Sequence, residues 1–560
     1  MRSRLRRVVA AVPGARRTAS WGRGVVADRR RRRRLAELAG LVASLRGRDD
    51  ADVALLGPAD PALVEAVRAA SVRARVTVID EEGGKRHVRM AALGPFDVVL
   101  DCDVPDERRR RFETAFFHLR PGAAYVVPDG ARELGPQRGP LGELLDPAAG
   151  VPDGTRRERA RTRQLREVVA RHVTHRAVGD HLVLAHDVPD VLVKMREPEF
   201  NAYLQQADTP HRVLERIPAE TPPAAPAGSE GPVPRRPPMQ RPITRAALSL
   251  RSYRDVVVAP RQVLVSGRVL LPDTYRHNQW PVLVHTQLEE LAPRFARRRV
   301  PLPADPPRLS GTYLHLDNEF RGHFGHLLTE SLSRAWSWPE AVRIDPDVRV
   351  LVGSTSKRPR PLPYELELYE ACGIPRDRID VIDGPVRVER LISGSPMFSH
   401  PQFVHPRIAE TWREVGDRLA AGAEDRAWPR RFFVSRRSDK RACRNGPEVE
   451  ALFAERGFEV VYPEDYSLGE QVRLFRAAEA IAGYAGSGLF QIAFVTEPTR
   501  VIMIGADTYS PRNEYLMAAV HGHRIDAVIC RSEGGGVQTS YSYDEEREGP
   551  YLRGLLDELP

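Results

Sequence analysis

Four residues suited to acid–base chemistry lie within one short stretch of the chain. The stretch contains Asp317 and the run His323-Phe-Gly-His326-Leu-Leu-Thr-Glu330. His326 and Glu330 are four residues apart, so on a helix they share one face. A carboxylate beside an imidazole can orient the ring and raise its basicity, which is what removing a proton from a hydroxyl requires. We therefore predict that His326, Glu330, His323 and Asp317 form a catalytic group.

Two other interpretations of this stretch stay open. His323 and His326 are both able to bind zinc, but the HExxH order is absent and no cysteine is close in sequence. The stretch could also be a helix start whose polar side chains satisfy the backbone. The spacing fits a general base better than a set of metal ligands, so no metal site is predicted.

A polar and cationic cluster follows the strand predicted at residues 431–435. Its members are Ser435, Arg436, Arg437, Arg441 and Asn445. Ligands bind at the carboxyl ends of parallel strands, and Arg is suited to bidentate contacts with phosphate. The cluster therefore predicts a substrate-binding edge, with a solvated basic loop as the alternative.

A glycine-rich turn follows a short predicted strand at residues 480–483. It contains Gly483, Gly486, Ser487 and Gly488, and a helix is expected to start at Gly488. Closely spaced glycines and a helix start allow backbone N–H groups to face a phosphate. The turn comes one β-α-β step after the arginine cluster, so both are expected at the same sheet edge.

Together the three clusters resemble glycosyltransferase family 61, whose members are often labelled capsular polysaccharide biosynthesis proteins. The likeness runs from about residue 255 to residue 530. The family's "NxGHFLLE"-like helix, "YISRR" strand, following "NExEv" to "lF..A" stretch and "GpHGAGL" loop are matched by residues 323–330, 433–437, 445–477 and 483–494. Two residues depart from the pattern: His323 stands for the family's Asn, and Ala485 stands for the His of the glycine loop.

The resemblance implies a fold and an activity. It implies a GT-B-like fold of two facing Rossmann-like halves and inverting, metal-independent sugar transfer. The donor would be a nucleotide sugar, the acceptor a glycan or a lipid-linked glycan, and no cofactor is expected. Asp101-Cys-Asp103 spells a DxD motif, but it lies outside the matching stretch.

The N-terminal part of the chain resembles a different family. Strands alternate with helices from Asp52 onward, which predicts a parallel α/β sheet. The order of the pieces resembles a class I methyltransferase core, with Asp80 after the second strand. The first loop, Leu56-Gly-Pro-Ala-Asp60, has one glycine and a proline, so we expect a degenerate domain without a working cofactor loop. S-adenosylmethionine-dependent methyl transfer is the alternative function.

The expected fold class is α/β, with a Rossmann-like N-terminal domain followed by a GT-B-like pair of halves. Nine prolines between residues 218 and 242 predict an extended linker. The predicted parts are an Arg-rich lead at 1–50, a Rossmann-like domain at 51–190, a linker at 216–243, an acceptor-side half at 250–400, a nucleotide-sugar half at 401–535 and a tail at 536–560.

The charge of the chain is concentrated at its N-terminus. The net charge is +10, yet residues 1–50 hold 15 Arg, no Lys and 4 acidic residues, a net of +11. The other 510 residues therefore sum to −1, which argues against a nucleic-acid platform. Leucines at helical spacing after Arg34 predict an amphipathic helix that either lies on an anionic membrane or packs on the next domain.

The sequence also bounds the compartment. No stretch approaches the roughly 20 apolar residues that a membrane-spanning helix needs. The four cysteines are scattered without CxxC spacing, which fits a reducing compartment. We expect a cytoplasmic glycosyltransferase, with peripheral contact to the inner face of the membrane through residues 1–48. A catalytically weakened binding protein is the further alternative, because Ala485 removes a family residue.

Overall fold

The computed structural model describes residues 15–136, 138–150, 153–232, 239–280, 282–424 and 426–559. The chain forms two compact units. Unit 1 comprises the described residues of Met1–Thr209, Arg268–Leu270 and Leu288–Pro301. Unit 2 comprises those of Pro210–Gly267, Leu271–Gln287 and Leu302–Pro560. The sequence prediction of mixed α/β architecture with parallel sheets is confirmed in both units.

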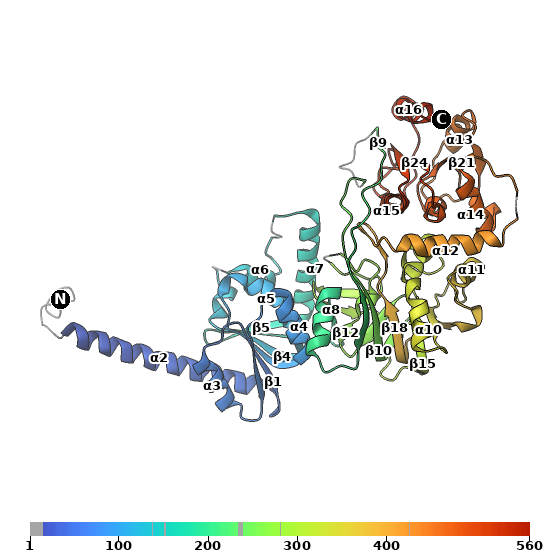
Figure 1. Ribbon diagram of the computed structural model, residues 1–560. Coiled ribbons are helices and arrows are strands. Elements are labelled where there is room, and N and C mark those ends of the chain that lie inside the picture. The colour runs from blue at the N-terminus through green and yellow to red at the C-terminus, as the bar shows by residue number, and fades with distance from the viewer. Residues whose placement is uncertain are drawn as a thin grey trace. The chain divides into compact units, whose positions relative to one another are not determined.

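The main sheet of unit 1 has the strand order β2-β1-β3-β4-β6-β5 (Figure 1). The strands are β1 (Asp52–Leu56), β2 (Arg75–Ile79), β3 (Phe96–Asp101), β4 (Leu119–Val127), β5 (Val173–Val178) and β6 (His181–His186). β1 to β4 are parallel, and β5 and β6 form an antiparallel hairpin next to β4. β1 and β3 are completely buried, as expected for central strands with helices on both faces.

Helices connect these strands. They are α3 (Pro61–Ala70), α4 (Gly83–Leu93), α5 (Arg108–Ala115), α6 (Pro140–Leu145) and α7 (Arg156–His172). Asp60 caps α3 by accepting a hydrogen bond from the amide of Ala62, and Pro61 occupies the first helical position, where its missing N–H costs nothing. The alternating sequence pattern predicts strands at 53–56, 76–79 and 96–100 and a helix at 61–70, and β1, β2, β3 and α3 lie there.

The long first helix is α2 (Ala15–Leu45). Its leucine stripe packs into unit 1, because Leu38 and Val42 are buried in a core that contains residues of β1, β3 and α3. Four of its arginines form ion pairs: Arg31 with Asp60, Arg32 with Asp28, Arg33 with Glu37 and Arg34 with Asp129. In the described part of α2, the apolar face is therefore occupied by the protein itself.

Unit 1 also contains four strands that are hydrogen-bonded in the order β13-β14-β7-β12. These strands are β7 (Leu192–Lys194), β12 (Val269–Leu270), β13 (Leu288–Ala292) and β14 (Phe295–Arg298), next to the helix α8 (Glu197–Gln206). Three of these strands come from the stretch predicted as the acceptor-side half. They belong to unit 1 because β7 pairs with both β12 and β14. The other predicted domain boundaries stay predictions.

The first sheet of unit 2 is mixed. Its strands are β8 (Arg212–Ile217), β10 (Leu248–Ala259), β11 (Val263–Ser266), β15 (Arg308–His315), β16 (Arg349–Gly353), β17 (Ile379–Ile382) and β18 (Val386–Gly394). β15, β16, β17 and β18 are parallel, whereas β10 is antiparallel to β18, β11 and β8. Two short strands, β19 (Phe398–Ser399) and β20 (Phe403–Val404), pair by themselves.

The second sheet of unit 2 is parallel throughout, in the order β22-β21-β23-β24-β25-β9. Its strands are β21 (Arg431–Val434), β22 (Glu459–Val461), β23 (Ala480–Tyr484), β24 (Arg500–Ala506), β25 (Arg524–Cys530) and β9 (Glu230–Gly231). The strand β9 comes from the predicted linker. It pairs with β25, and the amide and hydroxyl of Ser229 both donate to the carboxylate of Asp526.

The two sheets of unit 2 share one apolar core, which contains residues from both. The helix α12 (Ile408–Ala421) lies between them and contacts elements of both halves (Figure 1). The other helices of unit 2 are α10 (Trp338–Ile344), α11 (Pro363–Ala371), α13 (Gly446–Ala454), α14 (Leu468–Ala477), α15 (Arg512–His521) and α16 (Gly549–Asp557). The helix α11 ends two residues before Gly373, which adopts a positive φ of 81°.

Two predicted helices differ in kind. Residues 487–494 form a 3₁₀-helix, η9 (Ser487–Phe494), rather than an α-helix. The stretch after His323 begins with the one-turn helix α9 (Phe324–His326), continues as a π-helix, η5 (Leu327–Ser331), and then tightens into a 3₁₀-helix, η6 (Leu332–Ser337). Short π-helical turns inside helices often occur at functional sites.

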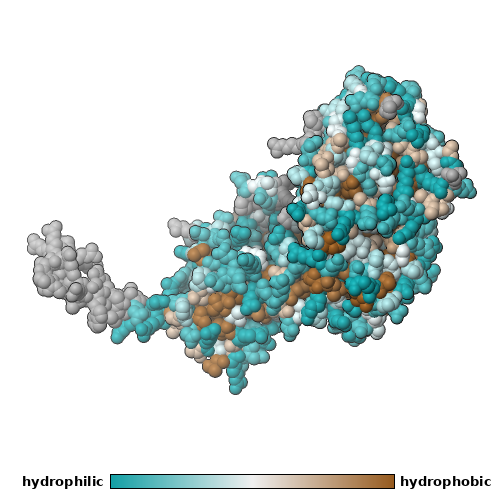
Figure 2. Space-filling view, in the orientation of Figure 1, coloured by the Kyte–Doolittle hydropathy of each residue, from teal (hydrophilic) through white to brown (hydrophobic). Residues whose placement is uncertain are grey.

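The described surface mixes hydrophilic and hydrophobic side chains on the face shown in Figure 2. Among the described helices, none is long and apolar enough to cross a membrane.

Candidate active site

A cavity of about 580 Å³ in unit 2 contains several of the predicted site residues. Residues of α9 and α11 line one part of it, and the loops after β21, β22 and β23 line the rest. The predicted residues in its walls are His323, Ser435, Arg436, Arg441, Ser487 and Gly488. Three motifs that are far apart in sequence therefore meet at the carboxyl edge of a parallel sheet, where ligands bind in such folds.

Arg436 follows β21 directly and is held from two sides. Its Nη2 donates to the carbonyl of Ala485 at 2.8 Å, and its guanidinium lies 5.4 Å from the ring centre of Tyr484. Burial lowers the pKa of Arg436 from its usual value, yet Arg stays protonated in proteins. Ser435 is fixed by its hydroxyl, which donates to Glu450 at 2.6 Å. The end of β21 thus presents an oriented cation to the cavity.

Arg441 adds a second cation to the same wall. Its backbone has a positive φ of 54°, and its guanidinium lies 4.3 Å from the ring centre of Tyr509. The guanidinium also passes close to Gly486, where an added Cβ would lie 2.9 Å from Nη2. Gly486 itself has a φ of 134°, which side chains rarely tolerate. A side chain at position 486 would therefore collide with Arg441 and strain the backbone, so this position requires glycine.

The glycine loop also touches the acid–base motif. An added Cβ on Gly325, in α9, would lie 3.3 Å from the Cβ of Ser487. Ser487 and Gly488 begin η9 and line the cavity, whereas Gly483 is buried in β23 beside Val434. The first and third motifs are therefore packed against each other.

His326 and Glu330 form a close pair, as the sequence predicts. His326 Nδ1 lies 2.6 Å from Glu330 Oε1. Burial raises the pKa of Glu330, but the neighbouring His326 and Arg276 outweigh this effect and lower it to about 2. Glu330 is therefore an anion at neutral pH, and the tautomer that donates from Nδ1 to Glu330 would leave Nε2 as the base. Arg276 Nη2 also lies 3.2 Å from Nδ1. Among the described residues, none bonds to Nε2.

The His326–Glu330 pair does not line the cavity, but it lies next to a residue that does. His323 lines the cavity, and its ring centre is 4.8 Å from that of His326. Desolvation, followed by the like charges of His326 and Arg441, lowers the pKa of His323 to about 4. His323 is thus neutral at pH 7.

Two residues at this site were missed by sequence reasoning. Arg276 Nη2 lies 2.9 Å from Glu330 Oε1, and its guanidinium lies 4.8 Å from the ring centre of Phe320. The Phe320 ring in turn stacks on His326, with the centres 4.9 Å apart and the planes at 25°. No local pattern marks Arg276, because it is a single Arg in an Arg-rich chain.

Three predicted residues make contacts elsewhere and do not line the cavity. Arg437 forms an exposed bidentate pair with Asp465, at 2.6 and 2.7 Å. The Asn445 amide binds the backbone of Tyr543. Asp317 is buried and accepts a hydrogen bond from the amide of Gln262, so it fastens the β10–β11 turn. Burial raises the pKa of Asp317.

The departure at position 485 has a local cause. The Ala485 side chain is buried, and an added Cβ on Gly505 would lie 2.8 Å from its own Cβ. An imidazole in this orientation would collide with β24. The carbonyl of Ala485 still takes part in the site because it accepts the hydrogen bond from Arg436.

The corresponding sheet edge of unit 1 is filled by its own side chains. After β3, Asp101 accepts hydrogen bonds from Arg111 at 2.8 Å and from Tyr125 at 3.1 Å. Asp103 accepts one from Arg86 at 2.9 Å, and both arginines are buried. The two acids of the DxD spelling are thus committed to arginines. In the described residues, no group of three His, Cys, Asp or Glu side chains could hold a metal ion.

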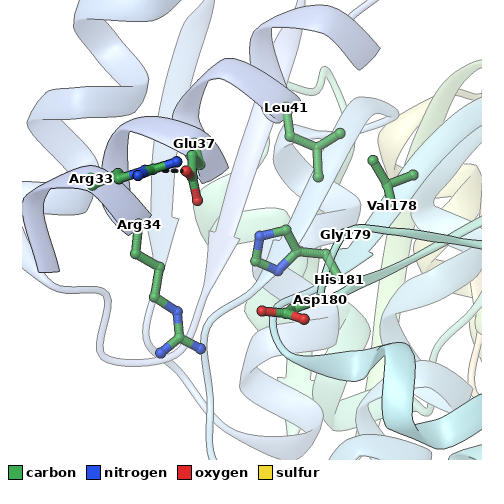
Figure 3. A pocket seen from close by; sticks show the side chains of 8 residues that line it. All are labelled: Arg33, Arg34, Glu37, Leu41, Val178, Gly179, Asp180 and His181. Atoms are coloured by element: carbon green, nitrogen blue, oxygen red, sulfur yellow. Dashed lines mark hydrogen bonds and ion pairs between the residues drawn. The ribbon is translucent and has the colours of Figure 1, made fainter. Parts of the chain in front are cut away.

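Unit 1 has another hollow of about 580 Å³, between α2 and the β5–β6 turn (Figure 3). Its walls include Arg33, Arg34 and His181. Arg33 pairs with Glu37, and Arg34 pairs with Asp129, so these cations are already neutralised. None of the predicted site residues lines this hollow.

Residues 324–502 match the family model described as Glycosyltransferase 61, so the chain contains a glycosyltransferase 61 domain. Comparison with curated protein sequences gives no match.

Solved structures resemble another part of the chain only distantly. The MycE methyltransferase from the mycinamycin biosynthetic pathway, in complex with Mg and SAH, is 17% identical with a TM-score of 0.19, over 26% of this chain and 47% of that chain. Cofactor-bound Rv0187 from MTB is 16% identical with a TM-score of 0.17, over 27% of this chain and 80% of that chain. The chain thus spans about half the length of MycE.

Proposed function

We propose that this chain moves a sugar from a nucleotide-sugar donor to a hydroxyl group of a glycan or lipid-linked acceptor. The observation that carries the proposal is the cavity of unit 2: Arg436 and Arg441 line it, and the His326–Glu330 pair lies behind its lining residue His323. Both arginines and the pair belong to the residues that match glycosyltransferase 61. The finer fold assignment, a GT-B-like pair of halves, belongs to the same proposal. The fully parallel second sheet and the shared core of unit 2 support it.

The second half would bind the donor. Arg436 and Arg441 lie beside the glycine loop, so a diphosphate there would meet two cations and the start of η9. Lys440 lines the same wall and adds to the positive field. These charges would stabilise the negative charge that develops on the departing nucleoside diphosphate.

The first half would activate the acceptor. His326 Nε2 would remove the proton from the acceptor hydroxyl, while Glu330 holds the ring and balances its new charge. The acceptor oxygen would bond to the anomeric carbon as the bond from that carbon to the diphosphate oxygen breaks. The proton ends on His326, the electron pair leaves with the nucleoside diphosphate, and the anomeric configuration inverts. Glu330 is the weaker base of the two because its pKa is held near 2.

The remaining predictions concern setting and specificity. The donor sugar, a capsular acceptor and a cytoplasmic location stay predictions. Peripheral membrane contact through residues 1–48 also stays a prediction. The paired arginines and buried leucines of α2 reduce its support, and residues 1–14 lie outside the described residues.

The proposal is tested first by binding. The full chain is screened by thermal shift against UDP, GDP, CMP and dTDP and their common sugar conjugates. We expect one nucleotide family to raise the melting temperature by mass action. The selected donor is then incubated with the chain and an acceptor library, and release of the nucleoside diphosphate is measured. Full stability without any nucleotide response would overturn the proposal.

A further inference from the structure

Arg276 lies in the loop after the short helix η4 (Pro272–Thr274), outside the stretch that matches the family model. It contacts both members of the acid–base pair: its Nη2 lies 2.9 Å from Glu330 Oε1 and 3.2 Å from His326 Nδ1. It also makes a cation–π contact with Phe320. The Phe320 ring in turn stacks on the His326 ring. Arg276, Phe320, His326 and Glu330 therefore form a closed ring of contacts.

We propose that Arg276 is the positioning residue of the general base: it contacts the Glu330 carboxylate and the His326 imidazole directly, and it also supports the face of the imidazole through Phe320. This inference rests on the proposed function, because it assigns Arg276 a task in the same transfer. A guanidinium suits this task, since it offers a planar donor edge to the carboxylate and a flat face to the aromatic ring at once. A lysine ammonium can make either contact, but it has no planar face to stack.

The loop that carries Arg276 is itself anchored. Asp273 is buried and accepts hydrogen bonds from Tyr253 at 2.5 Å and Ser393 at 2.7 Å. Its backbone carbonyl accepts a third from Gln262 at 2.8 Å. These partners come from β10, β18 and the β10–β11 turn, so the sheet fixes the place from which Arg276 reaches Glu330.

The charges around the pair make Arg276 the decisive cation. His277 and His400 face Glu330 from two other segments, and burial, then nearby charges that include Arg276, lower their pKa values to about 3 and about 4. His323 is neutral for a similar reason. Arg334 also acts on Glu330 electrostatically, from η6, but its guanidinium bonds to the backbone carbonyls of Asp317 and Asp273. Arg276 is thus the permanent cation that contacts the carboxylate.

The test is a histidine titration of the full chain. The chain is labelled with ¹³C at histidine Cε1, and the His326 resonance is assigned by its loss in His326→Gln. In Arg276→Met the midpoint of His326 should rise by about one pH unit, because a like charge has been removed nearby. Arg276→Lys should retain part of the effect. Arg407→Met, which breaks an exposed ion pair with Glu220 in the same unit, is the matched control and should leave the midpoint unchanged.

Kinetics with the donor from the screen supply the second readout. The acid limb of the kcat/KM profile should move upward in Arg276→Met, and kcat should fall about tenfold or more while KM changes little. An unchanged His326 midpoint in both Arg276 variants, with melting temperatures near that of the wild type, would overturn the inference. A shifted midpoint in a chain that transfers no sugar would instead overturn the proposed function alone.

Discussion

Arginines lie at the carboxyl ends of parallel strands in both units, but they have different bonding partners. In unit 1, Arg86 and Arg111 are buried and bound to Asp103 and Asp101. In unit 2, Arg436 and Arg441 stand at the wall of a cavity and contact carbonyl, aromatic and glycine groups rather than carboxylates. The arginines of unit 1 are neutralised by carboxylates, whereas no carboxylate is bonded to Arg436 or Arg441 among the described residues.

The difference teaches that the α/β architecture supplies a ligand edge but does not decide its use. What decides it is where the carboxylates lie. In unit 1 they occupy the strand end itself, at Asp101 and Asp103, so the edge closes on its own side chains. In unit 2 the strand end holds Ser435 and Arg436, and the acid Glu450 binds the serine instead. Four predictions test this contrast.

The largest effect is expected at the acid–base pair. His326→Gln keeps the size of the side chain but cannot act as a base. We expect kcat for sugar transfer to fall by about 10²- to 10⁴-fold, the usual contribution of a general base. The matched control is His172→Gln in unit 1, whose ring also bonds a carboxylate, Asp187, at 2.8 Å. Equal activities of both variants and the wild type would remove His326 from the mechanism.

The next effect concerns the closed edge of unit 1. Arg111→Met leaves Asp101 buried with one partner fewer, and breaking a buried pair in this way costs about 3–5 kcal/mol. Urea unfolding should show unit 1 losing this much stability, with nucleotide binding in unit 2 intact. Arg68→Met, at an exposed pair with Glu65, should cost less than about 1 kcal/mol. Comparable losses in the two variants would contradict the closed-edge interpretation.

The third effect is a dependence of stability on pH. The folded pKa of Glu330 is about 2, below its ordinary value of 4.5, because His326 and Arg276 outweigh the opposing effect of burial. The group therefore stabilises the fold fully above pH 4.5, on the order of 3 kcal/mol, and this contribution is lost as the pH falls toward 2. The free energy of unfolding should fall between pH 5 and pH 3 more steeply in the wild type than in Glu330→Gln. Parallel curves would show that Glu330 is not held as an anion.

The smallest effect is expected at the open edge of unit 2. Arg441→Met should weaken nucleoside diphosphate binding about 10- to 100-fold, the value of a charge-assisted hydrogen bond, and should hardly change stability. Arg444→Met is a matched control three residues away, because Arg444 pairs with Glu533 at the surface. Calorimetric titration measures both variants. A drop in stability of Arg441→Met without a loss of affinity would assign Arg441 to the fold instead.

Much of the fold could be predicted because its signals are local. The helix α3 begins and ends at the predicted residues, since Asp60, Pro61 and the apolar spacing act within one helix. The start of α14 is marked in the same way, because Ser467 and Glu470 form a capping box. The pairing of His326 with Glu330 also follows from spacing alone, even though a π-helical turn replaces the regular helix there.

The rest depends on contacts between distant residues. Arg437 was predicted to bind substrate, but Asp465 approaches it from the loop after β22, and no local pattern announces this partner. Asn445 is occupied in the same way by the backbone of Tyr543. Arg276 reaches the site only because β10 and β18 place its loop beside Glu330. A sequence pattern shows which residues can do chemistry, but the tertiary fold decides which of them are already bonded to other parts of the chain.

The short strand β9 has a practical consequence for anyone who wants to produce the transferase separately. A fragment cut at the end of the proline-rich stretch, near residue 240, would leave out Ser229 and β9 and would strip one edge from the parallel sheet. Asp526, which is fully buried, would lose two of its hydrogen bonds, and β25 would become an unprotected edge open to self-association. A fragment that begins before Leu192 keeps β9 beside β25 and also keeps β7, the partner of β12 and β14.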